Sequence, residues 1–186
     1  MRSSRVGITG SPATGKKTIG RALAEEMGVP CLNLNEVAGL AGFLVKEGRG
    51  EPKLDAVGFR RAAPKLLPAG GFVISGVFVP EAVPSRLLDK VVVLRCNPLV
   101  LAKRYEERGY GAKKTKENLT AEFLDACLGA ALQAFGGKVR EVDVTGMDLP
   151  RALSAVKASL KGAQPVGQVD WLSLIKGPED VFKFMS

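Results

Sequence analysis

The sequence predicts an α/β protein with a parallel sheet of about five strands flanked by helices. Short, unbroken apolar segments alternate with longer segments of helical spacing along most of the 186 residues. The clearest strand, Val91–Arg95, reads VVVLR, which is typical of a strand buried on both faces of a parallel sheet. A glycine-containing turn follows the first strand at once, which indicates a strand that leads directly into a helix.

The individual elements follow from apolar periodicity and from the residues that interrupt it. The first strand is expected at Val6–Thr9, and the helix Lys16–Met27 follows because its apolar residues recur at helical spacing. Gly28 and Pro30 stand where that helix should stop. The other expected strands are Cys31–Leu34, Phe72–Ser75, Val91–Arg95 and Val139–Val144. The other expected helices are Glu36–Lys46, Asp55–Leu67, Pro98–Arg108, Thr120–Phe135 and Leu149–Leu160.

The chain is long enough for one domain with its own core, and short for two. Residues 1–161 are predicted to form that domain, with a short lid at about 108–118. Residues 47–53 read EGRGEPK, and this polar, glycine-containing link is expected to be mobile. Residues 162–186 break the α/β pattern and form a C-terminal tail with apolar WLSLI and VFKF segments, which is expected to dock on its own domain rather than on a partner.

Composition excludes several classes of protein. Hydrophobic residues make up 46% and charged residues 25% of the chain, and no apolar run is long enough for a membrane span or a signal peptide, so a cytoplasmic protein without membrane partners is expected. Three cysteines without metal-binding spacing favour reduced thiols, and the absence of histidine excludes histidine bases and most zinc sites. The net charge of +8 fits RNA, ribosomal or polyphosphate partners, or simply a basic solvated surface.

The segment GSPATGKKT, Gly10–Thr18, completes the pattern G-x-x-x-x-G-K between the first strand and its helix. Glycines let the backbone curl so that its N–H groups point at phosphate oxygens, and the helix N-terminus adds a positive dipole. Lys16 can reach the β- and γ-phosphates. The alternative is a βα turn without a ligand. The residues expected to bind nucleotide are Gly10, Ala13, Thr14, Gly15, Lys16, Lys17 and Thr18.

Three segments resemble the adenylate kinase isoenzyme 6 family of archaea and eukaryotes. They are the loop Gly10–Thr18, the strand and exit turn Val91–Pro98 (VVVLRCNP), and the lid-like Arg104–Asn118 (RYEERGYGAKKTKEN). The resemblance covers roughly residues 5–160 and implies a P-loop NTPase fold. It further implies a nucleoside monophosphate kinase that converts ATP and AMP into two ADP, and an ATPase activity in small ribosomal subunit maturation with a ribosomal protein or rRNA as partner.

The resemblance also implies roles for single residues. Lys16, Arg104 and Arg108 would stabilise the transferred phosphoryl group, and the two arginines, four residues apart, share one side of a helix. The alternative for the arginines is a solvated basic face. Asn33 and Glu36 would lie at the monophosphate, and Thr18 would hold Mg²⁺ through water. The remaining lid residues are Gly109, Tyr110, Lys114 and Asn118.

Three positions depart from the family pattern. Ser75 stands where an acidic residue organises Mg²⁺, Val77 where the family has a histidine, and Gly39 where a basic residue is expected. A serine organises Mg²⁺ far less well than a carboxylate, so weakened activity is expected. Three hypotheses follow: an active nucleoside monophosphate kinase, a catalytically weakened, nucleotide-binding ribosome assembly factor, and a structural protein with a relic loop.

Overall fold

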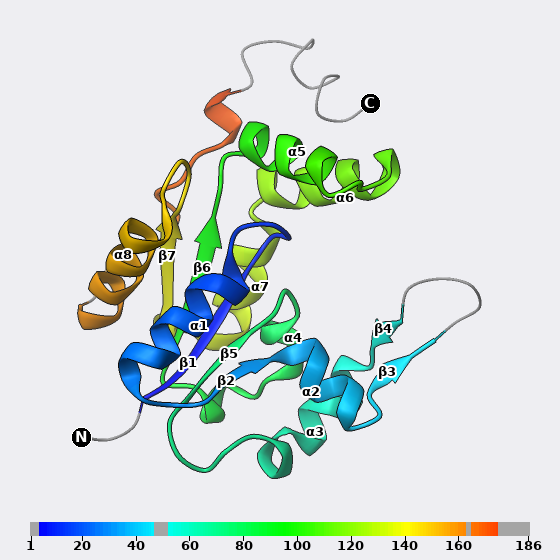
Figure 1. The fold of residues 1–186 in the computed structure, drawn as a ribbon, viewed down its shortest axis with the longest axis vertical. Coiled ribbons are helices and arrows are strands. Elements are labelled where there is room, and N and C mark those ends of the chain that lie inside the picture. Colours follow the sequence, from blue (N-terminus) through cyan, green and yellow to red (C-terminus); the bar gives the residue numbers. More distant parts are fainter. Residues whose placement is uncertain (1–3, 47–51, 163–164, 175–186) are drawn as a thin grey trace.

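The computed structural model describes residues 4–46, 52–162 and 165–174 of the chain. A parallel sheet forms its centre, with strands in the order β2-β5-β1-β6-β7 (Figure 1). The α/β class and the parallel sheet of five strands predicted from the sequence are therefore confirmed. These strands are Arg5–Gly10 (β1), Cys31–Asn33 (β2), Phe72–Ser75 (β5), Lys90–Arg95 (β6) and Val139–Asp143 (β7).

Helices connect these strands, and a small antiparallel hairpin projects beside α2 and α3 (Figure 1). The helices are Lys16–Met27 (α1), Leu34–Leu40 (α2), Ala56–Leu66 (α3), Val79–Ala82 (α4), Pro98–Glu107 (α5), Ala112–Phe123 (α6), Ala126–Phe135 (α7) and Leu149–Lys161 (α8). The hairpin strands are Leu44–Val45 (β3) and Lys53–Leu54 (β4), and short 3-10 turns cover Ser85–Leu87, Gly136–Lys138 and Leu172–Leu174. In the part of the chain that the structure describes, none of these helices is long and apolar enough to cross a membrane.

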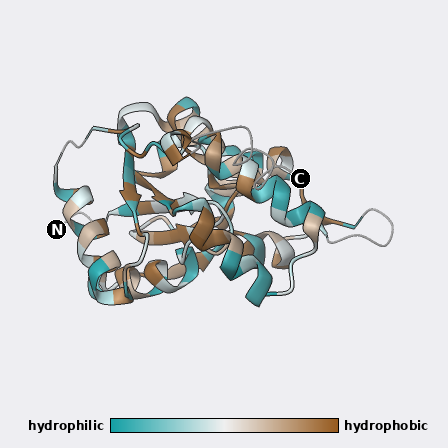
Figure 2. Cartoon of the chain, turned by 90° about the horizontal axis from the view of Figure 1, so that it is seen from above, coloured by the Kyte–Doolittle hydropathy of each residue, from teal (hydrophilic) through white to brown (hydrophobic). Residues whose placement is uncertain are grey.

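The sheet separates two apolar cores because successive side chains of a strand point to opposite faces. In β6, Val91 and Val93 join α3, α4 and α7 on one face. Val92 and Leu94 join α1, α5 and α8 on the other. Figure 2 shows the hydrophobic strands in the interior, between the helices. The VVVLR run is thus buried on both faces, as its sequence predicts.

The expected helix Glu36–Lys46 is wrong beyond Leu40. The chain turns there with Gly42 at φ +77°, a left-handed conformation that suits glycine, and then enters β3. The expected mobile link, 47–53, falls mainly on residues 47–51, which lie outside the described residues, and Lys53 belongs to β4.

The predicted lid is more regular than its sequence indicates. Residues from Ala112 onward are helical in α6, so the lid at about 108–118 is a tight turn followed by a helix. The expected single helix Thr120–Phe135 is two helices, because Asp125 adopts φ +54° and interrupts it. That conformation costs energy in a residue other than glycine, and Asp125 gains an ion pair with the buried Arg95.

The described part of the tail, residues 165–174, contacts the domain itself. Trp171 is 8% exposed and packs against Phe123 of α6. The contact agrees with the expected docking on the chain's own domain for these residues, whereas residues 175–186 lie outside the described part. The division into a domain, 1–161, and a tail, 162–186, stays a prediction.

Candidate active site

The turn between β1 and α1 has the curled backbone that a phosphate loop requires. Gly10 has φ +133°, and a Cβ there would lie 2.3 Å from the Leu94 carbonyl oxygen, so a larger residue does not fit. Ala13 and Gly15 also have positive φ, +61° and +93°. No side chain of the described residues caps the start of α1, which leaves backbone N–H groups available to an anion.

Lys16 lies folded beneath this loop. Its Nζ donates to the Ser11 carbonyl oxygen at 2.7 Å and lies 3.5 Å from Thr14 Oγ1. Burial lowers the pKa of Lys16 from 10.5 to about 8; Cys127 and Glu122 oppose this decrease, and Arg108 adds to it. The ammonium group therefore lacks a full counter-charge in the free protein, and a bound polyphosphate would supply one.

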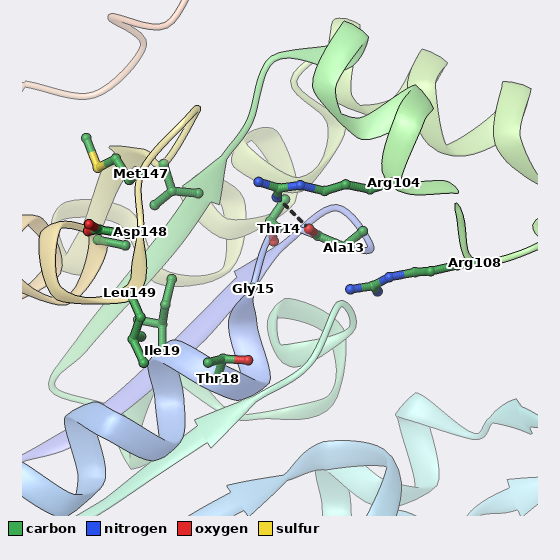
Figure 3. A pocket seen from close by; sticks show the side chains of 12 residues that line it. Ala13, Thr14, Gly15, Thr18, Ile19, Arg104, Arg108, Met147, Asp148 and Leu149 are labelled. Atoms are coloured by element: carbon green, nitrogen blue, oxygen red, sulfur yellow. Dashed lines mark hydrogen bonds between the residues drawn. The ribbon is translucent and has the colours of Figure 1, made fainter. Parts of the chain in front are cut away.

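A cavity of about 230 Å³ opens beside the loop. Ala13, Thr14, Gly15, Thr18 and Ile19 form one side of it, and Arg104 and Arg108 extend from α5 and its C-terminal end toward the same loop (Figure 3). The opposite wall comes from the turn before α8 and from the helix itself, through Val144, Met147, Asp148, Leu149 and Ala152.

Helix α5 is anchored on the loop by two hydrogen bonds. Arg104 Nη1 donates to the Ala13 carbonyl oxygen at 2.9 Å, and Tyr105 Oη donates to the Pro12 carbonyl oxygen at 3.0 Å. Tyr105 stacks on Tyr110, with ring centroids 5.1 Å apart and planes 2° from parallel. Lys114 Nζ lies 4.9 Å from the centre of the Tyr110 ring. The lid turn is therefore tied to the phosphate loop through an aromatic stack.

The predicted acceptor residues lie at the end of β2, on the other side of α1 from the cavity wall of α8. Asn33 caps α2 by accepting the Glu36 backbone N–H at 3.2 Å. Glu36 pairs with Lys17 Nζ at 3.0 Å, and both side chains are about two-thirds exposed. Asn33 is in register with Ser75 of β5, which is 1% exposed. The Ser75 Oγ lies 3.5 Å from the Leu32 carbonyl oxygen. This brings Lys17, Asn33 and Glu36 together at one edge of the loop.

The structure thus brings Ala13, Thr14, Gly15 and Thr18 together with Arg104 and Arg108 at one cavity. Gly10, Lys16 and Lys17 do not line it: Lys16 binds the Ser11 carbonyl oxygen, and Lys17 pairs with Glu36. Gly109, Tyr110, Lys114 and Asn118 do not line that cavity; they lie in the lid turn and α6. Asn118 Nδ2 is buried without a hydrogen-bond partner among the described residues. The sequence did not single out Ser11 within the loop, nor Tyr105 and Glu122, which contact the loop from α5 and α6. Only Ser11, inside the motif itself, carries a local signal.

Solved structures of small-molecule kinases share the fold at low sequence identity. Shikimate kinase from Aquifex aeolicus superposes with a TM-score of 0.55 at 17% identity, over 85% of this chain and 96% of the other. A gluconokinase from Sinorhizobium meliloti superposes with a TM-score of 0.51 at 18% identity, over 86% of this chain and 92% of that protein. Identities this low support a common fold and carry no conclusion about activity.

Sequence relatives are more specific. The family model described as "AAA domain" matches residues 6–125. A protein of Archaeoglobus fulgidus named "Putative adenylate kinase" is 34% identical over 176 residues, 90% of this chain and 92% of that protein. A protein of the same name from Thermococcus kodakarensis is 34% identical over 177 residues, which are 89% of this chain and 92% of that protein. Because similarity at this level spans nearly both lengths, the chain belongs to the P-loop family of these archaeal adenylate kinase relatives.

Proposed function

We propose that the chain is a nucleoside monophosphate kinase that transfers the γ-phosphoryl group of ATP to AMP. One observation carries this proposal: Arg104 and Arg108 extend toward the phosphate loop at the rim of the same cavity (Figure 3). A phosphate loop alone serves many kinds of ATP-binding protein. Two arginines that face the loop from α5 and its C-terminal end add the cations that phosphoryl transfer needs.

The cavity also suggests how ATP lies. The triphosphate would follow the loop from Ala13 to Thr18, where backbone N–H groups and the start of α1 favour negative charge. The base would extend toward Met147 and Leu149, whose apolar side chains form the far wall.

The reaction needs no covalent intermediate on the protein. An oxygen of the AMP phosphate attacks the γ-phosphorus, the bond to the β,γ-bridging oxygen breaks, and ADP leaves with that electron pair. Lys16 would exchange its bond to the Ser11 carbonyl oxygen for phosphate oxygens. Arg104 and Arg108 would neutralise the charge that spreads over the transferred group. AMP would approach from the edge formed by Asn33 and Glu36.

Mg²⁺ would enter with ATP, where it neutralises phosphate charge. Among the described residues there is no group of three or more His, Cys, Asp or Glu side chains that could hold a metal ion on its own. Mg²⁺ keeps several waters and often takes only one or two protein ligands besides phosphates, so the Thr18 hydroxyl in the cavity wall fits this role.

An ATPase that acts in small ribosomal subunit maturation is the second candidate. Its support is the net charge of +8, which fits rRNA or a ribosomal protein as partner. The two candidates differ in acceptor dependence, because a kinase requires the monophosphate and an assembly ATPase does not.

We expect ADP formation from ATP and Mg²⁺ to depend on AMP, with two ADP formed for each ATP consumed. A coupled assay with and without AMP measures this dependence, and a boiled sample controls for contaminating reagents. If ADP forms at the same rate without AMP, the kinase proposal is wrong and the ATPase is favoured.

Comparing the AMP-dependent rate of a Ser75→Asp variant with that of the unchanged protein tests whether Ser75 weakens the activity. The relatives support kinase activity and give no support to its loss at Ser75 and Val77. A faster AMP-dependent rate in the variant would attribute slow turnover to the serine. An unchanged or slower rate would show that this chain does not depend on a carboxylate there.

We expect ATP affinity to fall as pH rises above about 8, the pKa of Lys16 in the free protein. Above this pH the amine is neutral, so ATP binding must take up a proton, and the dissociation constant rises up to about tenfold per pH unit. Folding stability has the opposite sign: the unfolded chain retains the proton up to a pKa near 10.5, so the free protein gains stability between about pH 8 and 10.5.

Calorimetric titration with ATP from pH 7 to 9.5 measures this dependence. A Lys16→Met variant is the control, since it has no ammonium group to lose and its weaker affinity should not fall further. Constant affinity of the unchanged protein across this range would contradict the prediction.

A further inference from the structure

One buried carboxylate joins the phosphate loop to the C-terminal segment. Glu122 of α6 is 1% exposed, and its Oε2 accepts the Ser11 hydroxyl at 2.5 Å. Its Oε1 accepts the Trp171 indole N–H at 3.0 Å and Arg95 Nε at 2.8 Å. The two oxygens of one side chain therefore bind residues 11 and 171, which lie at opposite ends of the sequence.

The C-terminal segment is fixed at a second point close by. Glu141 Oε2 accepts the backbone N–H groups of Gly167 and Gln168 at 2.7 and 3.0 Å. Glu141 Oε1 accepts Arg95 Nη1 at 2.6 Å, so Arg95 bridges the two glutamates. Trp171 also packs against Phe123, the neighbour of Glu122. These contacts define where the indole lies relative to Glu122.

Ser11 is also the residue to which Lys16 is bound. Glu122 holds the Ser11 hydroxyl, and Lys16 Nζ donates to the Ser11 carbonyl oxygen at 2.7 Å. Any shift of Glu122 therefore reaches the anchor of the lysine that must turn toward the triphosphate. None of Glu122, Trp171 and Arg95 lines the cavity, so their influence on a ligand acts through the loop.

We propose that Glu122 is a positioning residue for the phosphate loop and that Trp171 of the C-terminal segment holds Glu122 in place. The segment then sets the affinity for the triphosphate and leaves the monophosphate side untouched. This inference rests on the proposed function in one respect, that the ligand of the loop is ATP.

A Trp171→Phe variant tests the proposal, because phenylalanine keeps an aromatic ring against Phe123 and removes the indole N–H. The dissociation constant and KM for ATP should rise about fivefold, a fraction of what a hydrogen bond to a charged group contributes, while KM for AMP stays unchanged. Leu172→Ala is the matched control, since its 54% exposed side chain lies on the same segment. A lower melting temperature with unchanged ATP affinity, or equal increases in both KM values, would overturn the proposal.

The chain contains one tryptophan, so its emission reports on this contact directly. ATP titration should change the fluorescence of Trp171, and a Ser11→Ala variant should lose that change while calorimetry still detects ATP binding. The same emission change in the unchanged protein and in Ser11→Ala would contradict the proposed connection between Trp171 and the phosphate loop. The ATP dissociation constant and the emission change need no turnover, so these two readouts test the proposal separately from kinase activity. A chain that binds ATP without AMP-dependent turnover would refute only the proposed function.

Discussion

Replacing Lys16 with methionine is expected to lower kcat for ADP formation about a thousandfold. Losing a single donor to developing oxygen charge commonly costs about 100- to 1,000-fold in rate. Lys16 is the first residue of α1, and its ammonium group lies within the loop. Methionine keeps a similar length and fills the same buried space. The measurement is kcat at saturating ATP and AMP.

The same variant should not unfold the protein. The charged form of Lys16 is disfavoured by burial, which is why its pKa falls to about 8, so an uncharged side chain removes that penalty. We expect an unchanged or higher melting temperature together with the loss of rate. Lys157→Met is the control, because Lys157 of α8 makes an exposed ion pair with Glu26 of α1. A kcat within tenfold of the original would show that the loop does not act on the transferred group.

The sequence was most informative where local patterns decide the structure. The boundaries of α1, Lys16–Met27, and of β5, Phe72–Ser75, agree with prediction at both ends. The amphipathic α1 and the apolar β5 are both bounded by glycine, so short-range constraints determine where they begin and end. The residues that line the cavity from the loop were found for the same reason, since their motif is contiguous.

Predictions failed where contacts between residues distant in sequence determine the local structure or the burial of a side chain. The break between α6 and α7 depends on Asp125, whose partner Arg95 lies 30 residues earlier. Glu122 looks like an ordinary surface residue of a polar helix, and its burial depends on Arg95 and on Trp171, 49 residues later. Periodicity cannot reveal such partners, because it records which face of a helix is apolar and not what meets it.

Replacing Arg95 with leucine is expected to destabilise the protein by about 3–5 kcal/mol, the usual cost of removing one partner of a buried ion pair. Arg95 is 1% exposed and pairs with Glu122 and Glu141, which are buried as well, and with Asp125. Burial works against its charge, but attraction to Glu122 and Asp125 outweighs this and raises the pKa of Arg95 above its usual value. Leucine would leave the carboxylates facing one another without a cation.

Urea unfolding measures this loss, and Arg5→Leu is the matched control. Arg5 makes one ion pair with Asp89, in which the side chains are 30% and 45% exposed, so its loss should cost less than about 1 kcal/mol. Arg95→Lys should fall between the two, since lysine keeps the charge and loses the fork that reaches several acceptors. If Arg95→Leu costs no more than Arg5→Leu, the buried cluster does not stabilise the fold. The position of Glu122 against Ser11 would then have to come from α6 packing rather than from Arg95.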